Sequence, residues 1–158
     1  MAQMVITVIG DDRAGLVDAL SEVVARHGGN WDRSQMAELA GKFAGIVLAT
    51  VPDLAVQAVV ADLEAVEATG LLDITTEVGD TSTTDDDGRI RLALRLLGQD
   101  HVGIVHDISH ALAQHGVSIE GLTTEVVPAP MGGSMFRAEA ALAAPANVAL
   151  EDLEAALE

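Results

Sequence analysis

The 158-residue sequence contains no cysteine and no tyrosine, and Trp31, Phe43 and Phe136 are its only large aromatic residues. Without cysteine there are no disulfides, thiolate nucleophiles or cysteine-ligated metals. Three aromatic rings offer little stacking surface to nucleic-acid bases. No apolar run is long enough to cross a bilayer, and the start of the chain lacks the basic region of a secretory signal. We therefore expect a cytoplasmic protein without a membrane partner.

Basic residues are also scarce. Eight Lys and Arg stand against 25 Asp and Glu, which gives a formal net charge of −17. This charge repels phosphate backbones and anionic lipid headgroups. Direct binding to nucleic acid is therefore not expected. The 49% hydrophobic content, in contrast, supplies the material for a folded core.

The chain repeats itself with an offset of 88 residues. Segments 6–30 and 94–118 align without a gap, and most non-identical pairs are apolar in both copies. The repeat predicts two copies of one folding unit, with domains at 1–80 and 89–158 and an acidic linker at 81–88. The identical pairs are Gly10/Gly98, Asp12/Asp100, Gly15/Gly103, Val17/Val105, Ser21/Ser109, Ala25/Ala113, His27/His115 and Gly28/Gly116.

Each copy has the same order of predicted elements. An apolar strand ends at glycine, and a helix of about 14 residues follows, ending where Gly28 or Gly116 permits a positive φ. A hairpin and a second helix come next. The first helix of each copy is indicated by apolar residues at helical spacing, which are Leu16, Ala19, Leu20, Val23 and Val24 or Ile104, Ile108, Ala111 and Leu112. The other segments of the first copy are 4–9, 30–39 with 43–51, 54–69 and a fourth strand at 72–78. Those of the second copy are 90–97, 118–127 with 135–143 and 147–157.

The βαββαβ order predicts an α+β fold of two ferredoxin-like repeats. The second repeat lacks its last strand, which is expected near 159–165. Either that sheet is one strand short or a neighbouring chain fills the gap. Because an unpaired strand edge favours association, we expect a homodimer.

The strand-to-helix turns carry a resemblance to a known family. GDDRAGLV at 10–17 and GQDHVGIV at 98–105, with HGGNWD at 27–32 and HGVSIE at 115–120, resemble the ACT domain turn G-x-D-R-P-G-[LI]-V and its strand entry G-x-N-I. The tandem arrangement and the PAPMGGSMF run resemble the glycine cleavage system transcriptional repressor subgroup. Two features depart from the pattern: alanine or valine replaces the proline, and Ser118 replaces the asparagine found at Asn30.

The resemblance implies a regulatory protein without catalytic activity or cofactor. In the family, an amino acid binds where the turn of one domain meets the second strand of a partner domain. Glycine or serine is the first ligand to consider, and the regulated target is another regulatory protein. The ligand-binding candidates are Asp12, Arg13, Ala14, Gly15, Leu16 and Asn30, with Asp100, His101, Val102, Gly103, Ile104 and Ser118.

The chemistry of the turns fits this site, since a helix N-terminus offers N–H donors and a positive dipole to a carboxylate. A simpler hypothesis is that Asp12 and Asp100 only cap their helices. His27 and His115 are expected at helix C-termini, where a cation meets the negative end of the dipole.

Two other functions are open. One is a ligand-free structural or adaptor dimer. The other is a metal-dependent hydrolase that uses His106 and His110 of the HDISH sequence, which are one helical turn apart. The corresponding residues of the first copy are Asp18 and Glu22, which is typical of a solvated helix face. No nucleophile and base stand at convincing spacing, so the hydrolase is the weakest hypothesis.

Overall fold

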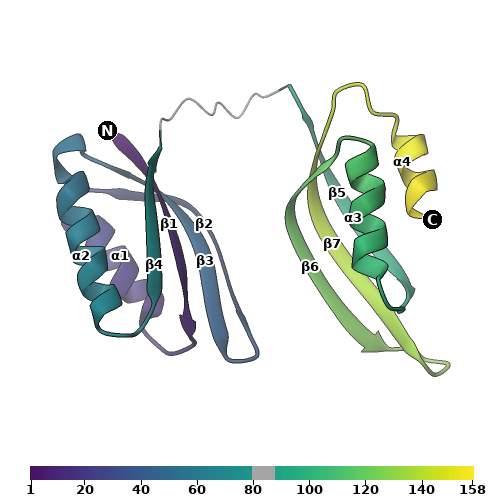
Figure 1. The fold of residues 1–158 in the computed structure, drawn as a ribbon, viewed down its shortest axis with the longest axis horizontal. Coiled ribbons are helices and arrows are strands. Elements are labelled where there is room, and N and C mark those ends of the chain that lie inside the picture. The colour runs from purple at the N-terminus through teal and green to yellow at the C-terminus, as the bar shows by residue number, and fades with distance from the viewer. Residues whose placement is uncertain (80–87) are drawn as a thin grey trace. The chain divides into compact units, whose positions relative to one another are not determined.

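The computed structural model describes residues 1–79 and 88–158, which belong to two compact units, Met1–Thr84 and Asp85–Glu158 (Figure 1). The predicted linker 81–88 lies outside the described residues, apart from Gly88. None of the helices in the described part is long and apolar enough to cross a membrane.

The first unit is a four-stranded antiparallel sheet in the order β2-β3-β1-β4, with both helices on one face (Figure 1). This confirms the predicted ferredoxin-like fold. Its elements are β1 (Ala2–Asp11), α1 (Leu16–Arg26), β2 (Asn30–Leu39), β3 (Lys42–Val51), the 3-10 turn η1 (Asp53–Ala55), α2 (Val56–Ala68) and β4 (Asp73–Gly79).

The second unit repeats this arrangement with three strands, in the order β5-β7-β6. Within residues 88–158 nothing corresponds to β4, so the prediction of a missing last strand is confirmed. Its elements are β5 (Ile90–Gln99), α3 (Ile104–Gln114), β6 (Ser118–Pro128), β7 (Ser134–Ala144) and α4 (Leu150–Leu157).

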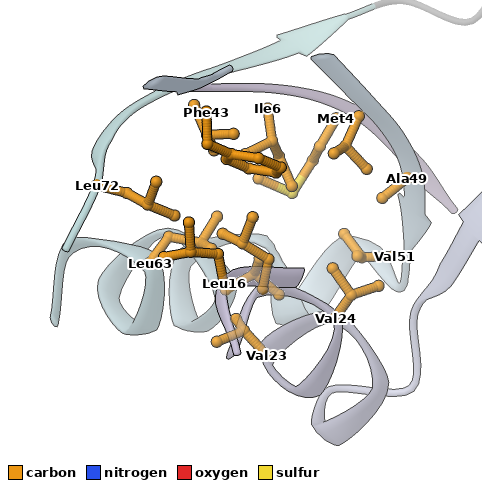
Figure 2. Packing of buried hydrophobic residues seen from close by; sticks show 14 residues of the cluster. Met4, Ile6, Leu16, Val23, Val24, Phe43, Ala49, Val51, Leu63 and Leu72 are labelled. Carbon is orange, nitrogen blue, oxygen red and sulfur yellow. The ribbon is translucent and has the colours of Figure 1, made fainter. Parts of the chain in front are cut away.

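Alternating apolar residues build the core of the first unit. Met4, Ile6 and Val8 of β1 point toward the helices and are at most 1% exposed. Figure 2 shows Met4 and Ile6 facing side chains from α1 and α2, and all three belong to a cluster of 14 buried residues. Each buried aliphatic side chain of this size stabilises the fold by roughly 1.5–3 kcal/mol. The period-two pattern of β1 and the helical pattern of α1 meet in this cluster.

The core of the second unit is smaller, with six buried residues. Leu92, Leu94 and Leu96 occupy the positions of Met4, Ile6 and Val8 but stay partly exposed. Their strand, β5, lies at the edge of its sheet, whereas β1 is flanked by β3 and β4. The unpaired edge therefore leaves the second core incompletely covered.

A glycine ends the first helix of each unit, as predicted. Gly28 and Gly116 have φ values of +74° and +71°. In α1 the N–H groups of Gly28 and Gly29 donate to the carbonyls of Ala25 and Val24, and α3 repeats the pattern. This is a Schellman motif. Both helices have 11 residues, fewer than expected, because each begins only after the left-handed glycine of the preceding turn.

An ion pair that the sequence did not reveal joins the two helices of the first unit. His27 at the C-terminus of α1 donates from Nε2 to Oδ2 of Asp62 in α2 at 2.6 Å, and Arg26 lies 3.6 Å from the same oxygen. The hydrogen bond from His27, aided by the charge of Arg26, lowers the pKa of Asp62. His115 instead donates from Nδ1 to the Ala111 carbonyl at 2.9 Å.

Replacing Asp62 with asparagine should destabilise the protein in a pH-dependent manner. Because the pKa of Asp62 is lower in the folded state, its ionisation stabilises the fold above the ordinary carboxyl pKa, and this stabilisation is lost as the pH falls through the folded value. The Tm difference between wild type and Asp62→Asn should therefore be present at neutral pH and shrink in acid. Glu64→Gln, on an exposed site of the same helix, is the control. A difference that grows on acidification would contradict the assignment.

The two equivalent glycines Gly10 and Gly98 should respond differently to valine. A Cβ at Gly10 would lie 2.5 Å from the Leu71 carbonyl oxygen and 3.0 Å from Leu72 Cδ2, whereas a Cβ at Gly98 has no heavy atom within 4 Å. We expect Gly10→Val to cost about 1–3 kcal/mol through overpacking and Gly98→Val to cost little. Urea unfolding can be followed by the fluorescence of Trp31 for the first unit and by circular dichroism for the whole chain. Equal losses in both variants would contradict this difference in packing.

Candidate functional site

The candidate residues 12–16 and 100–104 lie in two equivalent strand-to-helix turns. Gly15 and Gly103 take the left-handed conformation, with φ of +92° and +85°, and are the N-cap residues of α1 and α3. Their carbonyls accept the first helical hydrogen bonds, from Ala19 at 2.9 Å and Asp107 at 3.0 Å. Of the ten turn residues, only Leu16 is buried. The turns therefore present their backbone at the surface.

The hypothesis that Asp12 and Asp100 cap the helices is wrong. Neither α1 nor α3 has a side-chain cap hydrogen bond. The two aspartates instead anchor the turns through their backbone, since Asp12 N–H donates to the Gly41 carbonyl at 2.8 Å and Asp100 N–H to the Ser134 carbonyl at 3.0 Å. In α3 the Ile104 N–H donates to the His101 carbonyl at 3.3 Å. The other N–H groups of each first helical turn have no side-chain acceptor from the N-cap residue, and the helix dipole there favours an anion.

Asn30 and Ser118 lie at the opposite end of their sheets from these turns. Asn30 is level with Thr50 of β3, which is level with Gln3 at the start of β1. The turn follows Asp11, eight residues further along β1, which is about 27 Å at the rise of an antiparallel strand. Ser118 is likewise level with Arg91 at the start of β5. A single unit therefore does not bring the two groups of candidates together.

A charged residue that the sequence did not identify lies beside the start of β2, and another lies beside the start of β6. In the first unit, Asn30 Nδ2 donates to one carboxylate oxygen of Asp32, and Thr50 Oγ1 donates to the other. In the second, Arg89 donates to Ser118 Oγ at 3.1 Å and to the Gly116 carbonyl at 2.6 Å. Asn30 thus lies beside a negative side chain, whereas the equivalent Ser118 lies beside a positive one.

The turn of the second unit is also flanked by two hollows, each of about 380 Å³. One lies between the end of β5, the start of α3 and the end of α4, and is lined by the candidates His101 and Ile104 together with Asp107. The other lies against the loop between β6 and β7 and is lined by Gln99 and residues 129–135. In the first unit the hairpin turn is only Ala40–Gly41.

The His106 and His110 rings are stacked on α3, with centroids 5.8 Å apart and an interplanar angle of 22°. Both side chains are exposed. In residues 1–79 and 88–158, three or more His, Asp or Glu side chains do not gather at any point where they could hold a metal ion. In the described residues, a hydrolytic metal at this position would therefore have only two protein ligands, the rings of His106 and His110.

Comparisons with known proteins identify the family of both units. ACT domain signatures match residues 2–78 and residues 93–158. A search of curated proteins finds no match.

Among solved structures, an unknown protein from Galdieria sulphuraria is 30% identical, with 99% of this chain and 89% of that chain covered and a TM-score of 0.84. A candidate glycine cleavage system transcriptional repressor is 16% identical, with 98% and 86% of the two chains covered and a TM-score of 0.69. At that identity the second likeness shows the fold alone. The chain belongs to the ACT domain family and consists of two ACT domains in tandem.

Proposed function

We propose that this protein is an amino-acid-sensing regulator that acts through protein–protein contacts and has no catalytic activity. The observation that carries the proposal is the placement of the candidate residues at opposite ends of each sheet. Turns with an exposed backbone lie at one end, and the starts of β2 and β6 lie at the other. Each unit therefore carries two half-sites, the turn and the start of the second strand. A complete binding site forms only where the turn of one unit meets the strand start of another.

Side-by-side pairing of two units would complete these sites. β2 and β6 are the outer strands of their sheets. The end of β2 at Leu39 is level with Asp11, since both pair with Lys42. When the outer edges of two such strands pair antiparallel, the start of each strand therefore lies beside the turn of the other unit. One pairing of this kind forms two equivalent sites. Two-fold symmetry of this kind favours a homodimer in which the same edge serves both partners.

The charges around the halves match a zwitterionic amino acid. The first-turn N–H groups of α1 or α3 would bind the ligand carboxylate, and the left-handed glycine allows close approach to the backbone. The carboxylate of Asp32 suits the ligand ammonium group in one copy, whereas Arg89 in the other suits a second anionic group. Glycine and serine are the first ligands to test, given the resemblance to glycine cleavage repressors.

The net charge of −17 limits how such a regulator acts. Its surface repels DNA, so control of glycine cleavage genes would pass through another regulatory protein in the cytoplasm. Binding of the amino acid would shift the affinity for that partner, because a ligand stabilises the state to which it binds best.

An amino acid that binds the folded protein should raise its Tm. At a ligand concentration of 100 times the Kd, the stabilisation is about 2.7 kcal/mol. A thermal-shift screen of the common amino acids should identify at least one such ligand. If none raises the Tm, the protein is a ligand-free adaptor dimer instead.

The site can be located with Asp32→Asn, which should weaken binding of the identified amino acid by roughly tenfold if the lost charge pair is partly shielded from water. Ser34→Ala, on the same strand, is the matched control and should bind normally. Unchanged affinity in Asp32→Asn, or an equal loss of affinity in Ser34→Ala, would contradict the proposed ammonium site.

The purified protein should not shift duplex DNA in a mobility assay at physiological salt, because every phosphate contact would be made against a large net negative charge. A shift should appear only after a basic partner protein is added. A sequence-specific shift with the pure protein would contradict the proposed route of regulation.

A further inference from the structure

The outer strands β2 and β6 carry different side chains on the face that the helices cover. On this face, the residues of β6 that are level with buried residues of β7 are Ile119, Leu122, Thr124 and Val126. The offset of 88 residues places them on Trp31, Ser34, Met36 and Glu38 of β2. Near the middle of the strand, a small residue followed by a large one in β2 is thus a large residue followed by a small one in β6.

A hollow lies beside Thr124, where the first unit is filled. Met36 packs over Gly45, since a Cβ at Gly45 would lie 2.5 Å from Met36 Cγ. In the second unit the shorter Thr124 is level with Ala138, and a hollow of about 40 Å³ remains between α3, β6 and β7. Its lining residues are apolar apart from Ser109 and Thr124. An apolar side chain that enters such a hollow gains packing contacts.

This hollow reaches the surface along the outer edge of β6. β6 is an outer strand of its sheet, as β2 is of the complete four-stranded sheet. Leu122, which lines the hollow, is 46% exposed, and Ile119 and Val126 on the same strand face are exposed as well. The equivalents of Leu122 and Val126 in β2 are the polar residues Ser34 and Glu38. On this face, the edge of β6 is therefore more apolar than the edge of β2.

The side-by-side pairing of two β6 strands has a defined register. Ser118 must lie beside the turn of the other copy, and Val127 is level with Gln99, the last residue before that turn. With the helices of both copies on one side of the joint sheet, residues opposite each other must point to the same face. The register that meets both conditions within the strands places Ser118 opposite Val127. Counted past the bulge near the start of β6, it places Leu122 opposite Thr124.

A side chain of the second copy therefore lies next to the hollow. Opposite residues on one face have Cβ atoms about 4.5–5.5 Å apart, so Leu122 of one copy reaches the hollow beside Thr124 of the other. Two-fold symmetry repeats this contact, so each copy provides one leucine and receives one. The same register places Val126 opposite Ile119, which adds a second apolar pair.

A strand with the side chains of β2 fits the edge of β6 poorly. It would place Met36 opposite Leu122, which brings two large side chains together. It would also place Ser34 opposite Thr124, which leaves the hollow empty. Overpacking and unfilled space are both destabilising. Two β6 edges match each other in size, and the mismatch with β2 makes the pairing specific.

We propose that the second unit forms the homodimer contact of this protein, with Leu122 of each copy in the hollow beside Thr124 of the other. The inference rests on the side-by-side pairing in the proposed function, but it does not require an amino acid. The match in size between Leu122 and the hollow selects a second copy as the partner of β6.

The dissociation constant of the homodimer, measured by sedimentation of the full chain without amino acid, tests this assignment. Thr124→Met fills the hollow from within and meets Leu122 of the other copy, so it should raise the Kd by roughly tenfold or more. Leu122→Ser should raise the Kd similarly, because the hollow then stays empty. Leu39→Ser removes an exposed leucine from the outer strand of the first unit and should leave the Kd unchanged.

An exchange of side-chain size makes the test decisive. The double variant that combines Leu122→Ser with Thr124→Met carries the side chains of β2. It should form a tighter dimer than Thr124→Met alone, and in mixed samples it should not pair with wild type. Amide hydrogen exchange over 121–126 should slow as wild type dimerises. Wild type that stays monomeric at high micromolar concentration, a Kd insensitive to both single substitutions, or no rescue in the double variant would overturn the proposal.

The dimer measurement and the amino-acid screen can fail separately. If an amino acid raises the Tm but the β6 substitutions leave the dimer intact, the dimer contact is wrong and the sensing function stands. If the dimer responds as expected and no amino acid binds, the sensing function is wrong and the dimer contact stands.

Discussion

A glycine in the left-handed conformation connects strand to helix in each unit, and both the core and the candidate site depend on it. The turn at Gly15 directs α1 back over the sheet, so that Leu16 is 3% exposed immediately after a run of exposed residues. A side chain at this φ costs roughly 1–2 kcal/mol. The same turn places the uncapped start of the helix at the surface, and Asp12 fastens it to the hairpin through Gly41.

The two units share this turn but differ in how completely each sheet is covered. In the first, β4 shields β1, and the His27–Asp62 pair links the two helices. In the second, the edge of β5 is bare within the described residues and the core is smaller. Both copies thus keep the left-handed glycine turn, whereas within the described residues only the first has strands on both sides of the equivalent strand.

The fold was predictable from the sequence because its signals are local. Apolar runs ended by glycine predicted the first strand of each unit, and glycines marked the ends of α1 and α3 at Gly28 and Gly116. The 88-residue repeat then predicted the second unit from the first. The alternative hypothesis that Asp12 caps α1 was wrong, because the N-cap residue is Gly15, three residues after Asp12.

The remaining features depend on residues distant in sequence. Asp62 is 35 residues from His27, and Thr50 is 18 residues from Asp32, so no local pattern reveals either contact. The opposite placement of the turn and Asn30 follows from strand register, which only the paired sheet defines. The hollow beside Gly98 lies where Leu71 and Leu72 precede β4 in the first unit, and the described residues of the second unit contain no equivalent of them. Only a comparison of the two units reveals it.

The central claim is that an amino acid binds at these turns. It is tested most directly by two-dimensional amide NMR of the full chain, titrated with glycine and with serine. The account predicts shifts at the first-turn amides of α1 or α3, around Leu16 or Ile104, together with the strand starts at Asn30 or Ser118, while buried β3 amides such as Val47 stay unchanged. Shifts confined to other regions, or none with either amino acid, would contradict it.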